Sequence, residues 1–307
     1  MKTYTQCLSC FERQAADVCH MSNLGAPETE NVLNAVKTRI TTFPLNHPPI
    51  RMAIEIHDLI RLESGIADPY AAIKGMANNA CLDCLPLLTQ TMTTASIPLD
   101  TAVRLAIAGN IIDCGAYGLR EVSQSKLFDV IKEALAQPLM GSTIEMFNDL
   151  IVNASSILYI GDNAGECFFD KPLLALLPPR KVIYAVRGGP VLNDATIEDA
   201  RVAGIQEICR VIDTGDNAPG VILDRCSDEF LQIFNNSDLI ISKGQGNYES
   251  LSDMTDKTIA FLTKVKCEII AQDIGYPLNS HVIKICKPTL QSDKNSQQNN
   301  KMEVCHA

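Results

Sequence analysis

Residues 156–166 constrain the fold of this chain more than any other segment. A short apolar run at 156–160 is followed by Gly161, by the neighbouring polar residues Asp162 and Asn163, and by a second glycine that opens a helical stretch. This pattern predicts a strand that runs into a loop at the carboxyl edge of a parallel sheet, where both polar side chains can face one crevice. A carboxylate beside a carboxamide oxygen suits a hard divalent cation. A turn with a helix-capping Asp or Asn would explain the same residues without a metal.

Three further apolar runs end in polar loops of the same kind. They are the runs at 181–186, 208–212 and 238–242, and the residues that follow them include Arg187, Asp194, Lys243 and Gly244. Because the carboxyl ends of neighbouring parallel strands line one crevice, the acids could hold a metal and the lysine could hold an anion. The alternative is that these are the polar loops of an ordinary α/β domain.

The pattern of runs predicts an α/β protein with a Rossmann-like, mostly parallel sheet of about six strands flanked by helices. The last two strands are expected at 257–265 and 281–285. Residues 1–150 show helical periodicity that is interrupted by prolines, without a convincing strand, and this predicts an N-terminal all-helical domain or cap. The α/β domain is expected to span 151–288, and the polar segment 289–307 is expected to be a disordered tail.

The helical region contains a polar pair one helical turn apart. Asn110 and Asp113 follow Gly109, whose missing side chain lets another element pack closely. We interpret this pair as part of a face that closes over the crevice and contacts the substrate. A buried polar pair that fixes helix packing is the alternative.

The cysteines offer a second kind of metal site. Cys7 and Cys10 form one Cys-x-x-Cys pair and Cys81 and Cys84 form another, so the two pairs could together hold a structural zinc ion. The second pair falls in a helical pattern where positions i and i+3 merely share a face. We therefore favour buried or redox-inert thiols over a structural zinc site. The five histidines include no pair at i, i+4 spacing, which disfavours a histidine-based site and leaves oxygen ligands.

Composition excludes several classes of partner. The formal net charge of −10 disfavours general affinity for nucleic acid or for an anionic membrane surface, since both need basic protein surface. Neither a secretory leader nor an apolar run of membrane-spanning length is recognised, so we expect a cytoplasmic protein that carries thiols rather than disulfides. The oligomeric state is left open.

Seven short segments stand along the chain in an order that is more specific than any of them alone. They are Cys-Leu-Ser-Cys-Phe-Glu-Arg-Gln at 7–14, Asp-Pro-Tyr at 68–70, Gly-Asn-Ile-Ile-Asp at 109–113, Gly-Asp-Asn-Ala-Gly-Glu at 161–166, Arg-Gly-Gly-Pro-Val-Leu-Asn-Asp at 187–194, Ser-Lys-Gly-Gln-Gly-Asn-Tyr-Glu at 242–249 and Lys-Cys at 266–267. In this order they resemble the damage-control phosphatase family, also catalogued as domain of unknown function 89, and its branch with an amino-terminal Cys-x-x-Cys.

The resemblance implies a metal-dependent phosphomonoester hydrolase. Its substrates would be small phosphorylated metabolites such as sugar phosphates, phosphopantetheine-like compounds or damaged cofactor phosphates. Its catalytic residues and metal ligands would be Asp162, Asn163 and Asp194, with Lys243 facing the phosphate. Oxygen ligands of this kind bind Mg²⁺, Mn²⁺, Co²⁺ or Ni²⁺, so the identity of the metal is left open.

Phosphate hydrolysis also fits these residues without the family name. It needs charge neutralisation on the phosphoryl oxygens, and a divalent cation with Arg187 and Lys243 could supply this. Gly244 lets the backbone approach the phosphate. Either Asp162 or a metal-bound water could attack phosphorus, because both routes use the same residues.

Two rival functions are considered. A Rossmann-type enzyme that uses S-adenosylmethionine or a nucleotide expects a glycine-rich loop of the form Gly-x-Gly-x-x-Gly and an acid after the second strand. This chain has Gly-Asp-Asn-Ala-Gly and then Arg187 in those places, which disfavours that reading. A non-catalytic metal-binding protein is the second rival, because a fold does not fix a function.

Overall fold

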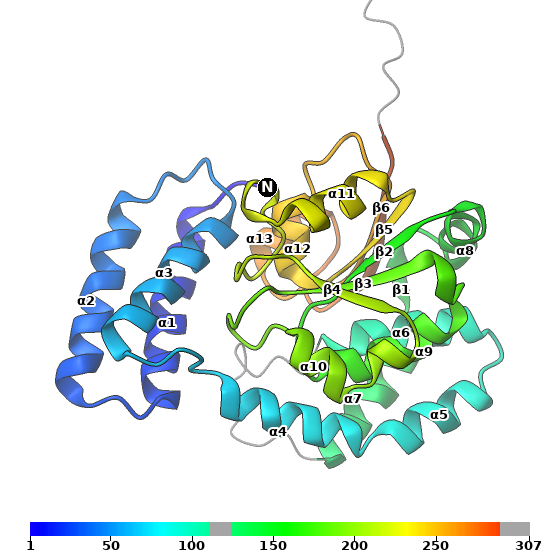
Figure 1. Ribbon diagram of the computed structural model, residues 1–307, viewed down its shortest axis with the longest axis horizontal. Coiled ribbons are helices and arrows are strands. Elements are labelled where there is room, and N and C mark those ends of the chain that lie inside the picture. The colour runs from blue at the N-terminus through cyan, green and yellow to red at the C-terminus, as the bar shows by residue number, and fades with distance from the viewer. Residues whose placement is uncertain (111–123, 289–307) are drawn as a thin grey trace, which may run out of the picture.

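A seven-stranded sheet forms the centre of the molecule in the computed structural model, which describes residues 1–110 and 124–288 (Figure 1). Its strand order is β1-β7-β6-β5-β2-β3-β4, and every neighbouring pair is parallel except β6 with β7. The strands are β1 (Leu139–Gly141), β2 (Ile157–Ile160), β3 (Val182–Val186), β4 (Arg210–Asp213), β5 (Leu239–Lys243), β6 (Ile259–Lys264) and β7 (His281–Cys286). The prediction of a mostly parallel α/β fold with an N-terminal helical region is confirmed.

Helices cover both faces of this sheet, and the first three helices of the chain form a separate group. They are α1 (Thr5–Met21), α2 (Ala26–Thr42), α3 (Pro49–Ser64), α4 (Ala71–Leu82), α5 (Leu85–Thr93), α6 (Pro98–Gly109), α7 (Gln124–Ala136), α8 (Ile144–Asn153), α9 (Glu166–Leu176), α10 (Ile197–Val202), α11 (Asp228–Asn236), α12 (Gly244–Leu251) and α13 (Glu268–Ile274).

One strand differs from the prediction. β1 lies within the segment that showed no convincing strand, and it pairs with β7 from Leu139↔His281 to Gly141↔Ile283. It has only three residues, too few for an alternating pattern to be visible against the helical sequence around it. The sheet therefore has seven strands rather than about six. The predicted tail at 289–307 lies outside the described residues.

The sheet is buried on both faces, which explains why its central strands are apolar throughout. Alternate side chains of each strand enter different cores. Tyr159 and Ile241 lie in the core that the sheet shares with α4 to α9, whereas Leu158 and Ile240 lie in the core that it shares with α11 to α13. A strand that is covered on both sides needs apolar residues at odd and even positions alike.

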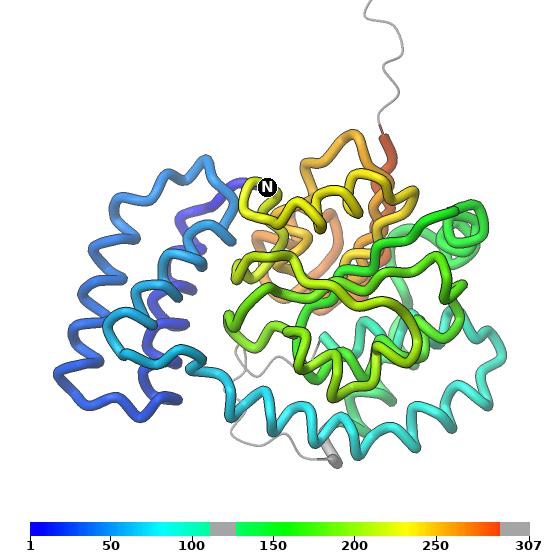
Figure 2. The backbone as a smooth tube through the Cα atoms, in the orientation of Figure 1, coloured from blue at the N-terminus to red at the C-terminus, as the bar shows by residue number. Residues whose placement is uncertain are grey.

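The helical region at 1–150 packs in two different ways. Helices α1 to α3 surround a core of their own and lie to one side of the sheet, whereas α4 to α7 pack on the sheet itself (Figures 1 and 2). Helix α3 reaches the loop after β4, where Ile50 and Ile54 contact Ala218 and Ile222. Because that loop follows the carboxyl end of a strand, α1 to α3 stand beside the carboxyl edge of the sheet.

No helix in the described parts of the chain has both the length and the apolar character needed to cross a lipid bilayer.

The contact between α6 and α9 gives a stability prediction. A Cβ added at Gly109 would lie 2.8 Å from Glu166 Cγ and 2.9 Å from Phe169 Cβ. We expect Gly109→Ala to lower the free energy of unfolding by about 1–3 kcal/mol, the usual cost of overpacking a core. Urea denaturation followed by circular dichroism measures this change.

The same substitution at Gly75 is the matched control. Gly75 lies within α4, is exposed, and has nothing within 4 Å of an added Cβ. Gly75→Ala should raise the free energy of unfolding by about 0.5–1 kcal/mol, because alanine is the better helix former. A destabilisation of equal size at both positions would contradict the packing of α6 on α9.

Candidate active site

The loops that follow β2 and β3 are joined by backbone hydrogen bonds. Asn163 and Asp194 form an isolated antiparallel bridge, and the Ala195 amide donates to the Asp162 carbonyl at 2.7 Å. Both carboxylate residues are buried, with exposed fractions of 8% for Asp162 and 4% for Asp194. The two loops therefore bring Asp162, Asn163 and Asp194 together, as the sequence pattern predicted for neighbouring strand ends.

The carboxylate of Glu166 and the carboxamide of Asn110 extend this cluster. The Asn110 Nδ2 atom donates to Asp162 Oδ2 at 2.6 Å and to Glu166 Oε2 at 3.2 Å. The Asn163 Nδ2 atom donates to the same two oxygens at 3.1 and 3.0 Å. Asn110 caps the C-terminal end of α6, so the helical region reaches this cluster, whereas its contact with the substrate stays a prediction. Asp113, the second residue of that predicted pair, lies outside the described residues.

Arg187 is paired with Asp194 and lies near Asp162. Its Nε atom donates to Asp194 Oδ2 at 2.7 Å, and its Nη2 atom lies 3.8 Å from Asp162 Oδ1. The side chain is 1% exposed, and both Nη1 and Nη2 are buried without a hydrogen-bond partner. A buried guanidinium with unpaired donors beside a carboxylate cluster is well suited to hold an anion such as phosphate.

Lys243 lies beneath the carboxylates rather than in open space. Its fully buried amine donates to Glu166 Oε1 at 2.5 Å, to Asp170 Oδ1 at 2.7 Å and to the Ala106 carbonyl at 2.7 Å. These three oxygens take all three donors of the amine. Burial disfavours its charge, but the two carboxylates outweigh burial and raise the pKa of Lys243, so the amine is charged. The prediction that Lys243 faces a phosphate stays a prediction.

Asp170 links this ion cluster to the sheet. The hydroxyl of Tyr159 donates to Asp170 Oδ1 at 2.6 Å, and the hydroxyl of Tyr184 donates to Asp170 Oδ2 at 2.8 Å. The two tyrosine rings stack with their centroids 5.2 Å apart. Residues of β2, β3 and β5 therefore all donate hydrogen bonds to the buried Asp170 carboxylate.

The electrostatics of Asp162 favour a bound cation. Burial, with the neighbouring carboxylates of Glu166 and Asp194, raises the pKa of Asp162 well above its ordinary value, although Lys266 and Arg187 oppose this shift. A divalent cation between Asp162 and Asp194 would offset the repulsion. In the part of the chain that the structure describes, no three His, Cys, Asp or Glu side chains are arranged as a metal site. The oxygen donors that could hold a cation are the carboxylates of Asp162 and Asp194 and the carboxamide of Asn163.

Two features require glycine at position 244, namely its backbone conformation and the close contact with Asp162. Its φ is +78°, and an added Cβ would lie 1.9 Å from Asp162 Oδ2. Glycine is therefore needed here for close approach to the carboxylate, whereas the sequence suggested close approach to a phosphate. Asn247, on the same helix, donates from Nδ2 to the carbonyls of Gly161 and Lys243 at 3.1 and 2.7 Å.

Glu166, Asp170 and Lys266 contribute to the site without having been predicted as site residues. Glu166 and Asp170 stand four residues apart at the start of a helix whose other residues are apolar except Lys171. Acids at i and i+4 in such a helix share one face. Because buried acids are usually paired, this spacing indicates a buried lysine as their partner. The signal was therefore present in the sequence.

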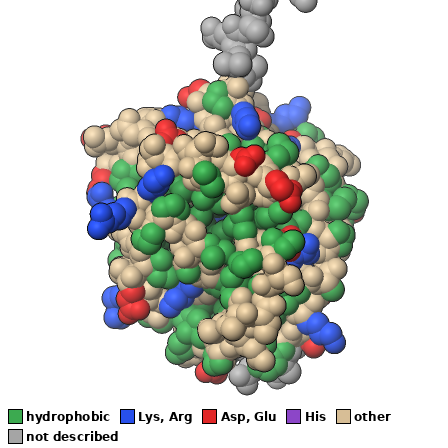
Figure 3. Space-filling model, turned by 90° about the vertical axis from the view of Figure 1, so that its right-hand side faces the viewer, with side chains coloured by type: hydrophobic (Ala, Val, Ile, Leu, Met, Phe, Trp, Pro, Cys, Tyr) green, Lys and Arg blue, Asp and Glu red, His purple; other side chains and the backbone are tan. Residues whose placement is uncertain are grey.

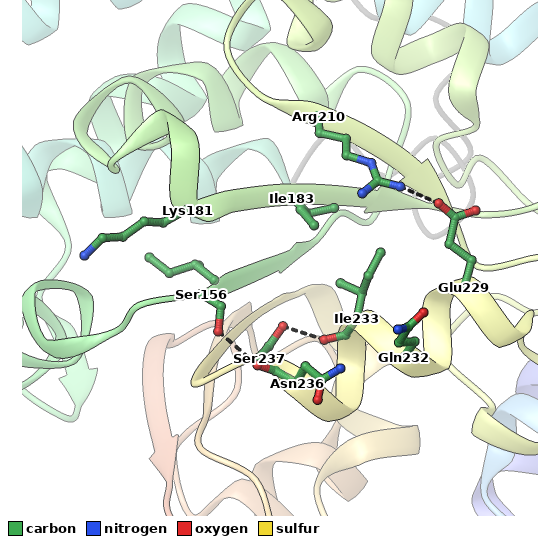
Figure 4. A pocket seen from close by; sticks show the side chains of 10 residues that line it. Ser156, Lys181, Ile183, Arg210, Glu229, Gln232, Ile233, Asn236 and Ser237 are labelled. Carbon is green, nitrogen blue, oxygen red and sulfur yellow. Dashed lines mark hydrogen bonds and ion pairs between the residues drawn. The ribbon is translucent and has the colours of Figure 1, made fainter.

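A cavity of about 370 Å³ lies at the opposite edge of the sheet (Figure 4). It is lined by Ser156, Lys181 and Arg210, which stand at the amino ends of β2, β3 and β4, and by residues of α11. Arg210 pairs there with Glu229. The cavity is lined by none of the predicted site residues.

The side of the molecule on which α8 lies gathers apolar side chains around its middle (Figure 3), and α8 itself exposes Met146 and Val152.

The two Cys-x-x-Cys pairs do not come together. Cys7 packs between the core of α1 to α3 and the core of α11 to α13, whereas Cys81 and Cys84 lie in the core on the other face of the sheet. The four thiols therefore do not form the four-thiolate site that they could have completed. Burial raises the pKa of Cys7 and of Cys10 above the ordinary range, which favours the thiol form.

Known proteins resemble this chain over nearly its whole length. The family model of the damage-control phosphatase ARMT1-like domain matches residues 3–282. This chain belongs to the damage-control phosphatase family. It is 34% identical to a damage-control phosphatase of Archaeoglobus fulgidus, with 93% of this chain and 99% of the relative covered, and 35% identical to an uncharacterised protein of Methanocaldococcus jannaschii, with 92% and 95% covered.

A solved structure of this family has the same fold. The crystal structure of a family member from Pyrococcus horikoshii superposes with a TM-score of 0.82 at 29% identity, covering 93% of this chain and 99% of that chain. The resemblance that the seven segments carried is thereby confirmed for nearly the whole chain.

The contact of Gly244 with Asp162 can be tested by substitution. Gly244→Ala should disrupt the carboxylate cluster, because the added methyl group would occupy the position of Asp162 Oδ2. Gly275→Ala is the control, since Gly275 has a similar φ of +85° with nothing within 4 Å of an added Cβ. The control should lose about 1–2 kcal/mol of unfolding free energy from backbone strain alone. We expect Gly244→Ala to lose clearly more in thermal or urea unfolding, and equal losses would contradict the contact.

Proposed function

We propose that this damage-control phosphatase homologue is a metal-dependent phosphomonoester hydrolase that acts on small phosphorylated metabolites. The observation that carries the proposal is the buried cluster of Asp162, Asn163 and Asp194 beside a guanidinium with unpaired donors. Negative ligands for a cation and a positive group for an anion then lie within a few ångströms of each other. Phosphoryl transfer needs this combination.

Asp162, Asn163 and Asp194 would hold the metal, which we take to be Mn²⁺, Co²⁺, Ni²⁺ or Mg²⁺. Two carboxylates and one carboxamide are oxygen donors that suit these ions. When bound, the ion would supply Lewis-acid stabilisation of the phosphoryl oxygens. The raised pKa of Asp162 implies that protons compete for this site, so a cation should bind more weakly as the pH falls.

The side chains of this chain would orient the substrate. Arg187 would direct its Nη donors at the phosphate while its Nε atom stays on Asp194. Lys266, which is close enough to Asp162 to lower its pKa, would add a second positive charge near Asp162. Asn110 would hold Asp162 in place through its 2.6 Å hydrogen bond, whether Asp162 or a water attacks phosphorus. Asp113 remains a predicted substrate contact of the same segment.

The two rival functions find less support. The loop after β2 places Asp162 and Asn163 where a dinucleotide or methyl-donor site would need glycines. The residue after β3 is Arg187, which is paired with Asp194 and cannot accept hydrogen bonds from a ribose. A non-catalytic metal-binding protein would keep the same ligands and release no phosphate.

Phosphate release tests the proposal directly. The metal-stripped protein is incubated with a panel of small phosphomonoesters, and Mg²⁺, Mn²⁺, Co²⁺ and Ni²⁺ are added back singly. We expect release that depends on the metal and differs among substrates. Asp162→Ala and Asp194→Ala should each lower kcat/KM by more than about 100-fold, since even residues that merely orient metal ligands cost up to that much.

Asp149→Ala provides the control for these variants. Asp149 is exposed on α8, away from the strand ends that carry the site, and its replacement should leave kcat/KM within about threefold of the wild type. If both site variants keep full activity, the proposed site is wrong. If the protein binds a divalent ion and releases phosphate from no substrate, the non-catalytic rival is supported instead.

A further inference from the structure

We propose that Glu166 is a positioning residue that sets the orientation of the Asn163 carboxamide, so that its oxygen faces the metal. This inference rests on the proposed function, because it concerns the metal held by Asp162, Asn163 and Asp194. It assigns to Glu166 a role distinct from metal ligation. The geometry that carries it lies entirely within the described residues.

Glu166 is the acceptor on which the amides of the site converge. Its Oε2 atom accepts hydrogen bonds from Asn163 Nδ2 at 3.0 Å, from the Asn163 backbone amide at 3.4 Å and from Asn110 Nδ2 at 3.2 Å. Its Oε1 atom accepts from the Lys243 amine at 2.5 Å. The carboxylate therefore contacts four donors and is fully buried.

The contacts of Glu166 decide which end of the Asn163 carboxamide faces the metal. Asn163 Nδ2 donates to Asp162 Oδ2 as well as to Glu166 Oε2. The Asp162 and Glu166 oxygens both accept from this side of the carboxamide, which places its NH₂ group on that side. The carboxamide oxygen is then directed away from Glu166 Oε2 and from Asp162 Oδ2. Only the oxygen can ligate a cation, and the reversed orientation would present NH₂ to it.

Glu166 is itself held by its surroundings. Gly109 of α6 packs so closely on its side chain that an added Cβ would lie 2.8 Å from Cγ. Lys243 holds its other oxygen and is in turn held by Asp170. Outer residues of this kind fix the geometry of the ligands that contact a metal. We infer that the ion cluster beneath the site holds Glu166 in a fixed position.

The central variant is Glu166→Gln, which keeps the shape but changes the acceptors. A glutamine that still accepts from Lys243 must turn its NH₂ group toward Asn163, where two NH₂ groups would meet. The Asn163 carboxamide should then reverse. We expect the dissociation constant for Mn²⁺, measured by calorimetry on metal-stripped protein, to rise at least about tenfold.

Glu229→Gln is the matched control. It makes the same change of glutamate to glutamine, but Glu229 is exposed, pairs with Arg210 at the opposite edge of the sheet, and makes no hydrogen bond to Asn163 or Lys243 among the described residues. The loss of one negative charge is thus the same, and the acceptor for Asn163 is kept. Its Mn²⁺ dissociation constant should stay within about threefold of the wild type. An increase equal to that of Glu166→Gln would overturn the inference.

A complementary pair separates orientation from loss of structure. In Glu166→Gln combined with Asn163→Asp, the new glutamine can donate its NH₂ group to the new carboxylate at 163, which again offers an oxygen to the metal. The double variant should regain most of the Mn²⁺ affinity that Glu166→Gln loses. Failure to regain it, in a double variant whose circular dichroism matches the wild type, would overturn the positioning role.

These results are distinguishable from failure of the proposed function. If the wild-type protein binds no Mn²⁺ and hydrolyses no phosphomonoester, the proposed function fails and the inference with it. If the wild type binds Mn²⁺ and Glu166→Gln binds it equally well, only the role of Glu166 is refuted.

Discussion

The enclosed ion cluster around Lys243 is the interaction on which the rest of the site depends. A fully buried amine meets two fully buried carboxylates, and removal of one partner from such a cluster typically costs about 3–5 kcal/mol because a charge is left unpaired. The cluster joins β5 to α9 and, through the Ala106 carbonyl, to α6. Of the residues that we assign to the metal, Asn163 is hydrogen-bonded to Glu166 of this cluster. Asn163 is joined in turn to Asp162 by a hydrogen bond and to Asp194 by a backbone bridge.

The helices before the sheet contribute to the same geometry from outside. The loop between Arg187 and Asp194 places Leu192 at a φ of +46°, an uncommon conformation for a residue with a side chain. Leu192 packs against the core of α1 to α3, and Arg61 of α3 donates to the Pro190 carbonyl at 3.3 Å. The strain at Leu192 is thus supported by packing. We infer that α1 to α3 help to hold Asp194 in place, in addition to standing beside the carboxyl edge of the sheet.

Much of the fold and the site could be predicted from the sequence because both rest on local patterns. Buried parallel strands read as apolar runs, and polar residues after such runs converge at one edge of the sheet, as Asp162 and Asp194 do. The spacing of Glu166 and Asp170 indicated a shared helix face, but the individual hydrogen bonds of Glu166 and Lys243 could not be assigned from the sequence. They depend on how α6 and α9 pack over the sheet, and their partners are far apart in the sequence. Strand β1 was missed for a related reason, since three residues become a strand only through pairing with β7.

The expectation that Gly244 lets the backbone approach a phosphate stays a prediction. A glycine after a strand is compatible with close approach of many groups, and the sequence does not reveal which one. In the structure the neighbour is the Asp162 carboxylate. The site is therefore more crowded than an open phosphate-binding loop, and its polar groups restrain one another.

The central claim is that Asp162, Asn163 and Asp194 together hold a divalent cation through oxygen. The most direct measurement is a crystal structure of the protein soaked with Mn²⁺, with anomalous diffraction recorded at the manganese edge. Our account predicts one strong anomalous peak within bonding distance of both carboxylates and of Asn163 Oδ1. A fully occupied peak elsewhere, or one that Asn163 does not contact, would contradict it.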